Sequence, residues 1–92
     1  MFQLEFTARA KESREALQGE DREAVEAALF KLRLNPTDLA YWRCKQDADA
    51  MHLFAGPEGK WKITFTVRLS GQIVLIHAIT RRRSLGFVPI VD

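Results

Sequence analysis

Hydrophobic and polar residues alternate most regularly between positions 61 and 69. The apolar side of this segment consists of Trp61, Ile63, Phe65, Val67 and Leu69, and the polar side of Lys62, Thr64, Thr66 and Arg68. Successive residues of a strand point to opposite faces of a sheet, so this period of two predicts a strand. One face of the strand is expected to be buried, and the other to be wet and basic.

A second strand is predicted directly after the first. Ser70-Gly71 has the composition of a tight turn, and residues 73–79 are almost wholly apolar. A short continuous apolar run is typical of a strand in the middle of a sheet. Thr80 and three consecutive arginines, residues 81–83, follow it. The hairpin is therefore expected to bring a cluster of cations to one end of the sheet, where it can hold a phosphate chain.

Two registers of this hairpin fit the sequence. A two-residue loop pairs Thr64 with His77, and His77 then shares the polar face with Lys62. A three-residue loop pairs Lys62 with Thr80 and turns His77 into the core. A slip of one residue exchanges the two outcomes. We favour the three-residue loop, because it groups Lys62 with Arg82.

The N-terminal half is predicted to contain a short strand and two helices. Residues 2–6 alternate as in a strand, and Thr7 is a suitable N-cap for a helix that runs to about Leu17 or Gln18 and stops at Gly19. Three acidic residues, Glu20, Asp21 and Glu23, favour the start of a second helix. An apolar stripe at three- and four-residue spacing follows, formed by Val25, Ala28, Leu29 and Leu32, and Asn35-Pro36 ends the helix.

The middle of the chain is less regular. Residues 37–49 are mostly polar, and Tyr41 and Trp42 are expected to cover an edge of the core without forming an element. Residues 51–54 are predicted to be a strand, closed by the turn residues 56–59. The order β-α-α-β-β-β predicts one α+β domain over residues 1–92, with two helices against a small, mainly antiparallel sheet.

The charge of the chain is unevenly distributed. The net charge is +2, but residues 1–49 hold 8 Lys and Arg against 10 Asp and Glu, whereas residues 50–92 hold 6 against 2. A one-sided basic surface favours a polyanion or an acidic protein as partner. The alternative is a solvated face that binds neither.

Several classes of protein are not supported by the sequence. One cysteine, Cys44, cannot form an internal disulfide, and there is no set of zinc ligands, so we expect neither a metal nor a cofactor. The longest apolar run, residues 73–79, is too short to span a bilayer, so no membrane partner is expected. We see no secretory signal pattern and expect a cytoplasmic protein.

In layout and in several motifs the chain resembles the RelE/ParE superfamily of bacterial toxins from type II toxin–antitoxin systems. The matching segments are residues 6–10 leading into the first helix, Asn35-Pro36 after the second, the strand start at residues 59–65, and residues 77–83. The resemblance implies the family's fold and a protein antitoxin as partner. It also implies that the toxin can form homo-oligomers when the antitoxin is absent.

Toxins of the RelE branch cleave messenger RNA on the ribosome without a metal. Such cleavage needs a base for the 2′-hydroxyl, cations for the charged phosphorane and an acid for the leaving oxygen. The resemblance places Lys62 at the family's strand arginine and Arg82 at the arginine after the last strand, both as catalytic groups. Further phosphate or RNA contacts are expected from Lys60, Arg68, Arg81 and Arg83.

The chain departs from the family pattern at two places. Residues 51–54 carry no lysine where the most active members have a lysine pair. A C-terminal tyrosine is also missing, with Phe87 as the nearest aromatic residue. Some branches use histidine or glutamate as the base, so His52, His77 and Glu58 are additional candidates.

Three functions remain open from the sequence. The first is a ribosome-dependent messenger-RNA endoribonuclease that inhibits translation. The second is a ParE-like toxin that poisons DNA gyrase by binding, and the third is an inactive module of the same fold that binds its antitoxin as a corepressor. The apolar tail, residues 87–91, and the first helix are expected to offer surface to the antitoxin.

Overall fold

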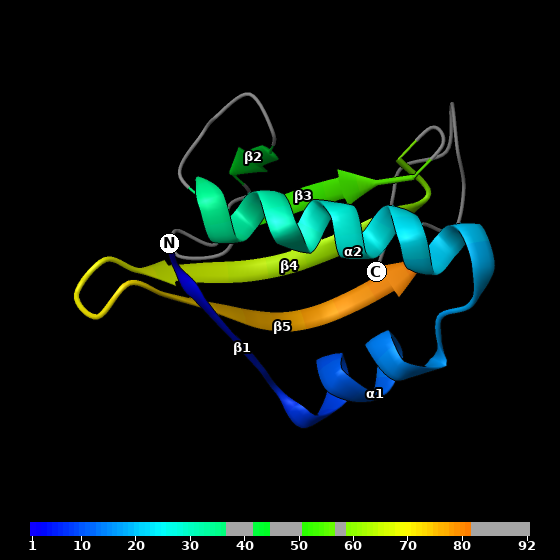
Figure 1. Cartoon of the computed structure of the whole chain (residues 1–92), viewed down its shortest axis with the longest axis horizontal. Helices are drawn as coiled ribbons and strands as arrows, with labels where there is room; N and C mark the ends of the chain where they lie inside the picture. The colour runs from blue at the N-terminus through cyan, green and yellow to red at the C-terminus, as the bar shows by residue number, and fades with distance from the viewer. Residues whose placement is uncertain (37–41, 45–50, 57–58, 82–92) are drawn as a thin grey trace.

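Five strands form one mixed sheet, and two helices lie on one side of it (Figure 1). The computed structural model describes residues 1–36, 42–44, 51–56 and 59–81. The elements in chain order are β1 (Gln3–Phe6), α1 (Ala8–Ala16), α2 (Gly19–Leu34), β2 (Trp42–Cys44), β3 (Met51–Ala55), β4 (Trp61–Arg68) and β5 (Ile73–Arg81). The prediction of an α+β domain with two helices on a mainly antiparallel sheet is confirmed.

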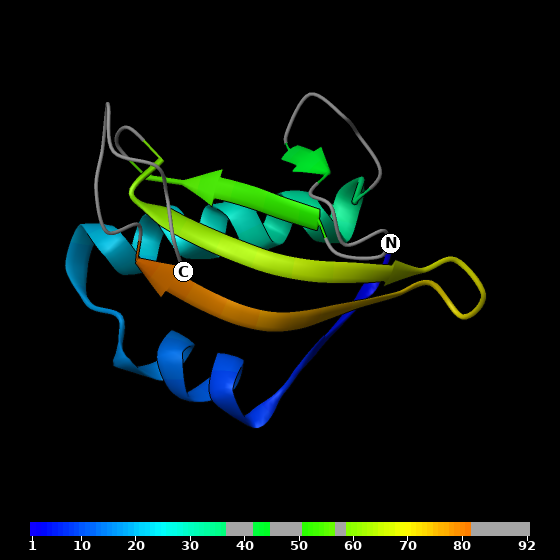
Figure 2. The same ribbon diagram turned by 180° about the vertical axis from the view of Figure 1, so that it is seen from behind.

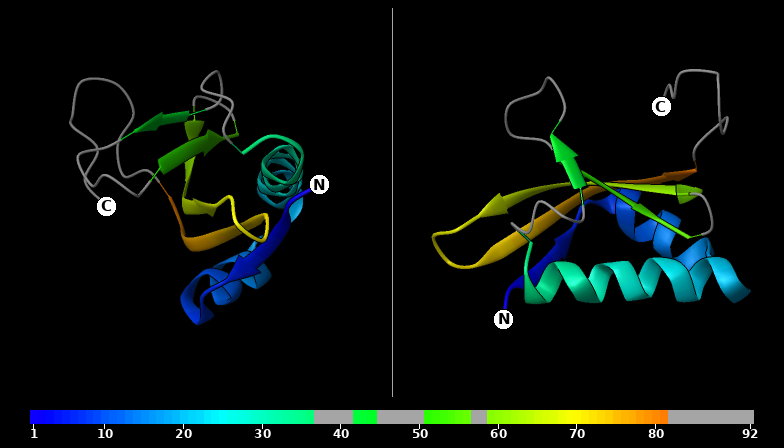
Figure 3. Two further views of the ribbon diagram at one scale, coloured as in Figure 1. Left: turned by 90° about the vertical axis from the view of Figure 1, so that its left-hand side faces the viewer. Right: turned by 90° about the horizontal axis from the view of Figure 1, so that it is seen from above.

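The sheet order is β1-β5-β4-β3-β2. Strand β1 pairs with β5 in parallel, and the other pairs are antiparallel. In the right-hand view of Figure 3, both helices are drawn beneath the sheet, on the same side of it. We call the face toward α2 the inner face, and the opposite one the outer face.

Two local predictions were wrong. Trp42–Cys44 forms a three-residue strand on β3, although no element was expected there. Three residues are too few to show the alternation by which a strand is predicted from sequence, so only the pairing with β3 reveals this one.

Gly19 does not stop the first helix, which ends at Ala16. It is instead the first residue of α2, with a φ of +58°. Glycine adopts this left-handed conformation without steric cost, which allows the tight junction between the helices.

The core lies between α2 and the inner face of the sheet. Val25, Leu29 and Leu32 of α2 form the buried stripe that the sequence predicted. They face the apolar residues of the central strands, among which Ile63, Phe65, Val74 and Ile76 have no exposed surface. No helix in the described part of the chain has the length and apolar content needed to cross a membrane.

The hairpin of β4 and β5 combines both registers considered above. Between Lys62 and Thr80 the pairing is the one we favoured, but a β-bulge shifts the register between Thr64 and Phe65. Beyond the bulge, toward the turn, the strands follow the other register, in which Arg68 pairs with Ile73. The extra residue on β5 is His77. The expectation that His77 lies in the core opposite Phe65 was therefore wrong, because Phe65 pairs with Ile76.

An ion pair joins the two helices. Nε of Arg14 in α1 lies 2.7 Å from Oε2 of Glu26 in α2, and a second bond of 2.8 Å makes the contact bidentate. The Arg14 guanidinium also lies 4.7 Å from the centre of the Phe6 ring. The hydrogen bonds from Arg14 hold the pKa of Glu26 below its ordinary value, despite partial burial. This contact fixes α1 against α2 and the end of β1.

Phe65 tests the core directly. Because its side chain is fully buried, Phe65→Ala is expected to lower the free energy of unfolding by about 3–5 kcal/mol, through lost burial and the cavity left behind. Leu69→Ala is the matched control, because Leu69 is 69% exposed and its loss should change stability by less than about 0.5 kcal/mol. Urea denaturation of both variants measures the difference, and equal midpoints would contradict this account of the core.

Glu26 is expected to make stability depend on pH. Its pKa is lower in the folded state than in the unfolded chain, where glutamate titrates at about 4.3. Its contribution is therefore complete above about pH 4.3 and is lost as the pH falls through the folded-state pKa. Because both side chains are more than a third exposed, the effect should stay below about 1 kcal/mol. Glu26→Gln should flatten the acid limb of the stability curve, and an unchanged slope would contradict the assignment.

Candidate functional site

The outer face of β3, β4 and β5 carries the polar side chains of the hairpin, and these strands lie in front of α2 in Figure 2. Ile63, which follows Lys62 in the strand, is buried on the inner face. Successive side chains of a strand point to opposite faces, so Lys62 lies on the outer face. Cross-strand pairing aligns Phe54, Lys62 and Thr80 in one row and His52, Thr64 and Ala78 in the next. Two sequence-predicted residues, Lys62 and His52, are thus on adjacent rows.

The bulge brings His77 to the same face. Its Nε2 forms a hydrogen bond of 3.0 Å with Oγ1 of Thr66, which alternates with Phe65 and lies on the outer side. Its Nδ1 makes no hydrogen bond within the part of the chain that the structure describes. The side chain is half-buried, so one ring nitrogen is held while the other is not. The bulge therefore places an imidazole on the face that carries Lys62.

Thr7 holds the backbone at this bulge. Its hydroxyl donates to the carbonyl of His77 at 2.8 Å and accepts from the backbone N–H of Ala10 at 3.1 Å. The second bond is the N-cap of α1 that the sequence predicted. One hydroxyl therefore connects the start of α1 to the bulged residue of β5.

His52 is oriented in a similar way on the neighbouring strand. Its Nδ1 lies 3.1 Å from Oγ1 of Thr64, and only 8% of the residue is exposed. Thr64 and Thr66 are separated by one residue on β4, so the two imidazoles flank the same stretch of this strand from opposite sides. Because His52 is the more buried of the two, His77 is better placed to meet a molecule from solution.

Thr80 has an unusual environment beside Lys62. Its Oγ1 is buried, and in the described part of the chain it has no hydrogen-bond partner. A buried hydroxyl without a partner is destabilising, and such atoms are often explained by function. Thr80 pairs directly with Lys62 across the strands.

Lys60 faces the other way. Its Nζ lies 3.1 Å from Oδ1 of Asp21 in α2. The indole N–H of Trp61 and the Lys60 ammonium group lower the pKa of Asp21. This indole N–H is buried without a standard hydrogen bond to any described residue, so we attribute its effect to its dipole. Lys60 is therefore engaged with α2.

The remaining predicted cations are distributed along the hairpin. Arg68 is exposed and lines a hollow of about 450 Å³ on the edge of the outer face, together with Thr66 and Leu75. Arg81 is exposed at the end of β5, pairs with Trp61 and contributes to the low pKa of Asp21. Glu58, Arg82, Arg83 and the tail, residues 85–91, lie outside the described residues.

The outer face brings together side chains whose chemistry suits phosphate binding and proton transfer. Lys62 provides a cation, Thr80 a hydroxyl, and His77 an imidazole on one continuous face. No group of three or more potential metal ligands occurs among the residues the structure describes. The sequence reasoning missed Thr66 and Thr80. Thr66 could have been found from the sequence, because it alternates along the strand in step with Lys62 and so lies on the same face. The burial of the Thr80 hydroxyl is visible only in the structure.

Comparison with known proteins identifies the fold. No protein-family model matches the sequence, and no curated protein matches it. Among solved structures, a chain of the Escherichia coli RelBE toxin–antitoxin complex has a TM-score of 0.77 at 17% identity, covering 91% of this chain and 100% of that one. This chain has the RelE-type fold.

Two further similar structures come from distant organisms. The RelE–RelB complex of the archaeon Pyrococcus horikoshii matches with a TM-score of 0.65 at 11% identity, covering 90% of this chain and 98% of that one. A toxin–antitoxin complex of Mycobacterium tuberculosis matches at 0.60 and 14% identity, covering 88% and 98%. The fold is shared at identities too low to carry a residue-by-residue function.

Thr7 is expected to control the position of His77. Thr7→Ala removes the N-cap of α1 and the bond to the His77 carbonyl, and should cost about 1–2 kcal/mol of stability. It should also shift the ring resonances of His77 in a two-dimensional NMR spectrum. Thr7→Ser keeps the hydroxyl and serves as the control. If Thr7→Ala left the His77 resonances in place, Thr7 would act on α1 alone.

Proposed function

We propose that this chain is the toxin of a bacterial toxin–antitoxin pair and that it cleaves RNA on the outer face of its sheet. The RelE-type fold supports the class of protein. The observation that carries the chemistry is the pairing of Lys62 with Thr80, whose buried hydroxyl has no partner among the described residues. A bound phosphodiester brings a negative charge to the Lys62 ammonium group and a hydrogen-bond acceptor to the Thr80 hydroxyl.

The proposed reaction is an internal transesterification. His77 takes the proton of the ribose 2′-hydroxyl, and the resulting oxygen attacks the adjacent phosphorus. The bond from phosphorus to the 5′-oxygen breaks, and that oxygen takes a proton from a second group, for which His52 is the candidate. The Lys62 ammonium group stabilises the negative charge that builds up on the phosphorane oxygens. The products are a 2′,3′-cyclic phosphate and a free 5′-hydroxyl, and each proposed step uses side-chain groups of this chain.

The other cations take supporting roles in this proposal. Arg68, exposed beside Thr66, contacts the RNA backbone along the outer face. Arg81 ends β5, and Arg82 and Arg83 follow it in sequence. All three are proposed to hold the flanking phosphates, with Arg82 as a second group for the transition-state charge. The substrate is messenger RNA on the ribosome, in the cytoplasm. An antitoxin prevents this activity until it is removed.

The first experiment is controlled expression in bacterial cells, with translation and replication followed by pulse labelling. The proposal expects a rapid stop in protein synthesis together with cut messages. Arrested replication with intact messages would indicate a gyrase poison instead. Growth without any arrest would indicate a module that only binds its antitoxin.

Lys62→Ala is expected to reduce cleavage by about a hundredfold, because it removes one group that stabilises the transition state. Stability should change little, since the side chain is only half-buried. The control is Lys31→Ala, which removes an exposed lysine of α2 on the opposite side of the sheet. Primer extension on messages from induced cells measures the cut sites. Undiminished cleavage by the Lys62→Ala variant would exclude Lys62 from the mechanism.

A further inference from the structure

The ring of His77 is held by one partner on the neighbouring strand. Thr66 pairs with Leu75, so His77 lies diagonally across from Thr66, two residues farther along β5. Diagonal neighbours on one face of an antiparallel pair are within reach of aromatic side chains. Nε2 of His77 lies 3.0 Å from Oγ1 of Thr66, and this is the only hydrogen bond of the ring to a described residue. The ring is therefore fixed through Nε2.

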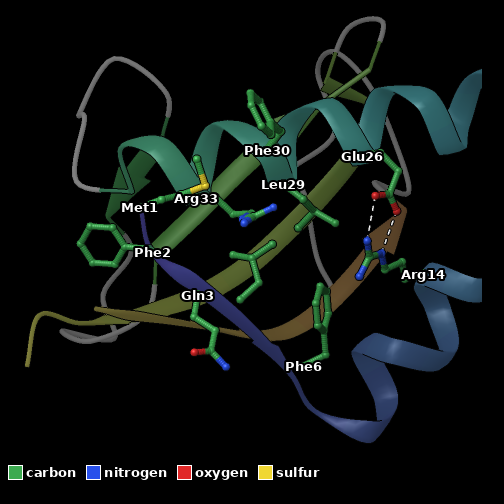
Figure 4. A pocket seen from close by; sticks show the side chains of 10 residues that line it. Met1, Phe2, Gln3, Phe6, Arg14, Glu26, Leu29, Phe30 and Arg33 are labelled. Carbon is green, nitrogen blue, oxygen red and sulfur yellow. Dashed lines mark hydrogen bonds and ion pairs between the residues drawn. The ribbon is translucent and has the colours of Figure 1, made fainter. Parts of the chain in front are cut away.

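The backbone that carries this ring is held as well. Thr7 donates its hydroxyl hydrogen to the carbonyl of His77 at 2.8 Å. Thr7 is itself fixed by its neighbour, because the Phe6 ring lies 4.7 Å from the Arg14 guanidinium, which is bonded to Glu26 (Figure 4). Main chain and ring are thus anchored to different elements of the fold. A side chain held in this way keeps one orientation, which a group that moves a proton requires.

The hydrogen bond between Thr66 and His77 can run in two directions. One nitrogen of a neutral imidazole donates and the other accepts, whereas a threonine hydroxyl can do both. If Nε2 donates to Oγ1, the lone pair is on Nδ1, the nitrogen that has no partner among the described residues. If the hydroxyl donates to Nε2, Nδ1 carries the hydrogen and cannot take a proton. Only the first direction lets the unbonded nitrogen act as a base.

The first direction also persists while a proton is transferred. Both ring nitrogens of an imidazolium donate, so a bond from Nε2 to Oγ1 is the same before and after Nδ1 gains a proton. In the second direction Nε2 would gain the proton, and the hydroxyl would have to turn away. Thr66 is half-buried and lines the hollow of about 450 Å³, so its own hydrogen can reach water. Nothing else in the described contacts of Thr66 has to change during the reaction.

We propose that Thr66 is the positioning residue of His77. Its Oγ1 accepts the bond from Nε2–H and holds the imidazole in the tautomer whose Nδ1 lone pair takes the proton of the 2′-hydroxyl. Nδ1 gains that proton, Nε2 keeps its own, and the imidazolium gives up the extra proton to water after the products leave. This role of Thr66 rests on the proposed function, because it needs a reaction in which the lone pair is used.

His52 and Thr64 supply a matched comparison. The ring of His52 is bonded through Nδ1 and not Nε2, at 3.1 Å from Oγ1 of Thr64. Thr64 and Thr66 lie on the same face of β4, and both are half-buried. Valine in place of either threonine removes the hydroxyl and keeps a β-branched side chain suited to a strand. Thr66→Val should therefore affect the ring of His77, and Thr64→Val that of His52.

Nitrogen NMR of the imidazoles tests the direction of the bond. The full-length chain, isotope-labelled in nitrogen, is measured at a pH well above the usual titration range of histidine, where the ring is neutral. A ring nitrogen with a hydrogen and one without then resonate far apart. In the wild type we expect the hydrogen of His77 on Nε2. Thr66→Val should give a mixture of both tautomers, whereas Thr66→Ser and Thr64→Val should keep the wild-type pattern at His77.

Cleavage in cells connects the tautomer to the reaction. Primer extension on messages from induced cells should show a loss of at least about tenfold for Thr66→Val, because the competent tautomer is less populated and less firmly held. Thr66→Ser keeps the hydroxyl and should cleave like the wild type. His77→Ala should lose more than Thr66→Val, about a hundredfold or more, because it removes the base itself.

The outcomes separate the role of Thr66 from the proposed function. A hydrogen on Nδ1 of His77 in the wild type, which is measured without any variant, overturns the role of Thr66 and leaves RNA cleavage intact. A Thr66→Val variant that keeps the single tautomer, or that loses it without losing cleavage, overturns it as well. A wild type that cuts no message overturns both, whatever tautomer His77 adopts.

Discussion

The pairing of β4 with β5 is the constraint on which the rest of this structure depends. Its inner side buries Ile63, Phe65 and Ile76 without exposed surface, and α2 closes over them. Both helices, the parallel strand β1 and the antiparallel strand β3 are added to this hairpin. A hairpin with one face buried cannot slip by a residue without exposing its core, so the outer face is fixed as firmly as the inner one.

The bulge adds an irregularity to this constraint. If β4 and β5 paired evenly from Lys62 to the turn, His77 would point into the core against Phe65. The extra residue lets Phe65 meet Ile76 and leaves His77 on the outer side, bonded to Thr66. Bulges are common next to functional sites because they redirect one side chain without disturbing the rest of the sheet. Here Thr7 anchors the bulge, so its position is fixed from a third element.

Strand β5 lies between two parts of the sheet. One of its edges pairs with β4, which carries Lys62, and the other pairs with β1. Thr7 lies directly after β1 and contacts His77 on β5.

Much of this architecture was determined by the sequence itself. Alternation from Trp61 to Leu69 predicts both the strand and the position of Lys62 on its polar face, because the period of a strand follows from backbone geometry alone. The apolar stripe of α2 and the N-cap at Thr7 likewise follow from residues that are close together in the sequence.

Strand β2 was missed because three residues show no period. The bulge was missed because neither register of the hairpin has a local cost that the sequence reveals. The position of His77, the buried hydroxyl of Thr80 and the pairing of Lys60 with Asp21 were decided only by the tertiary structure. Each depends on contacts between residues far apart in the chain, and long-range packing is what selects among locally equivalent arrangements.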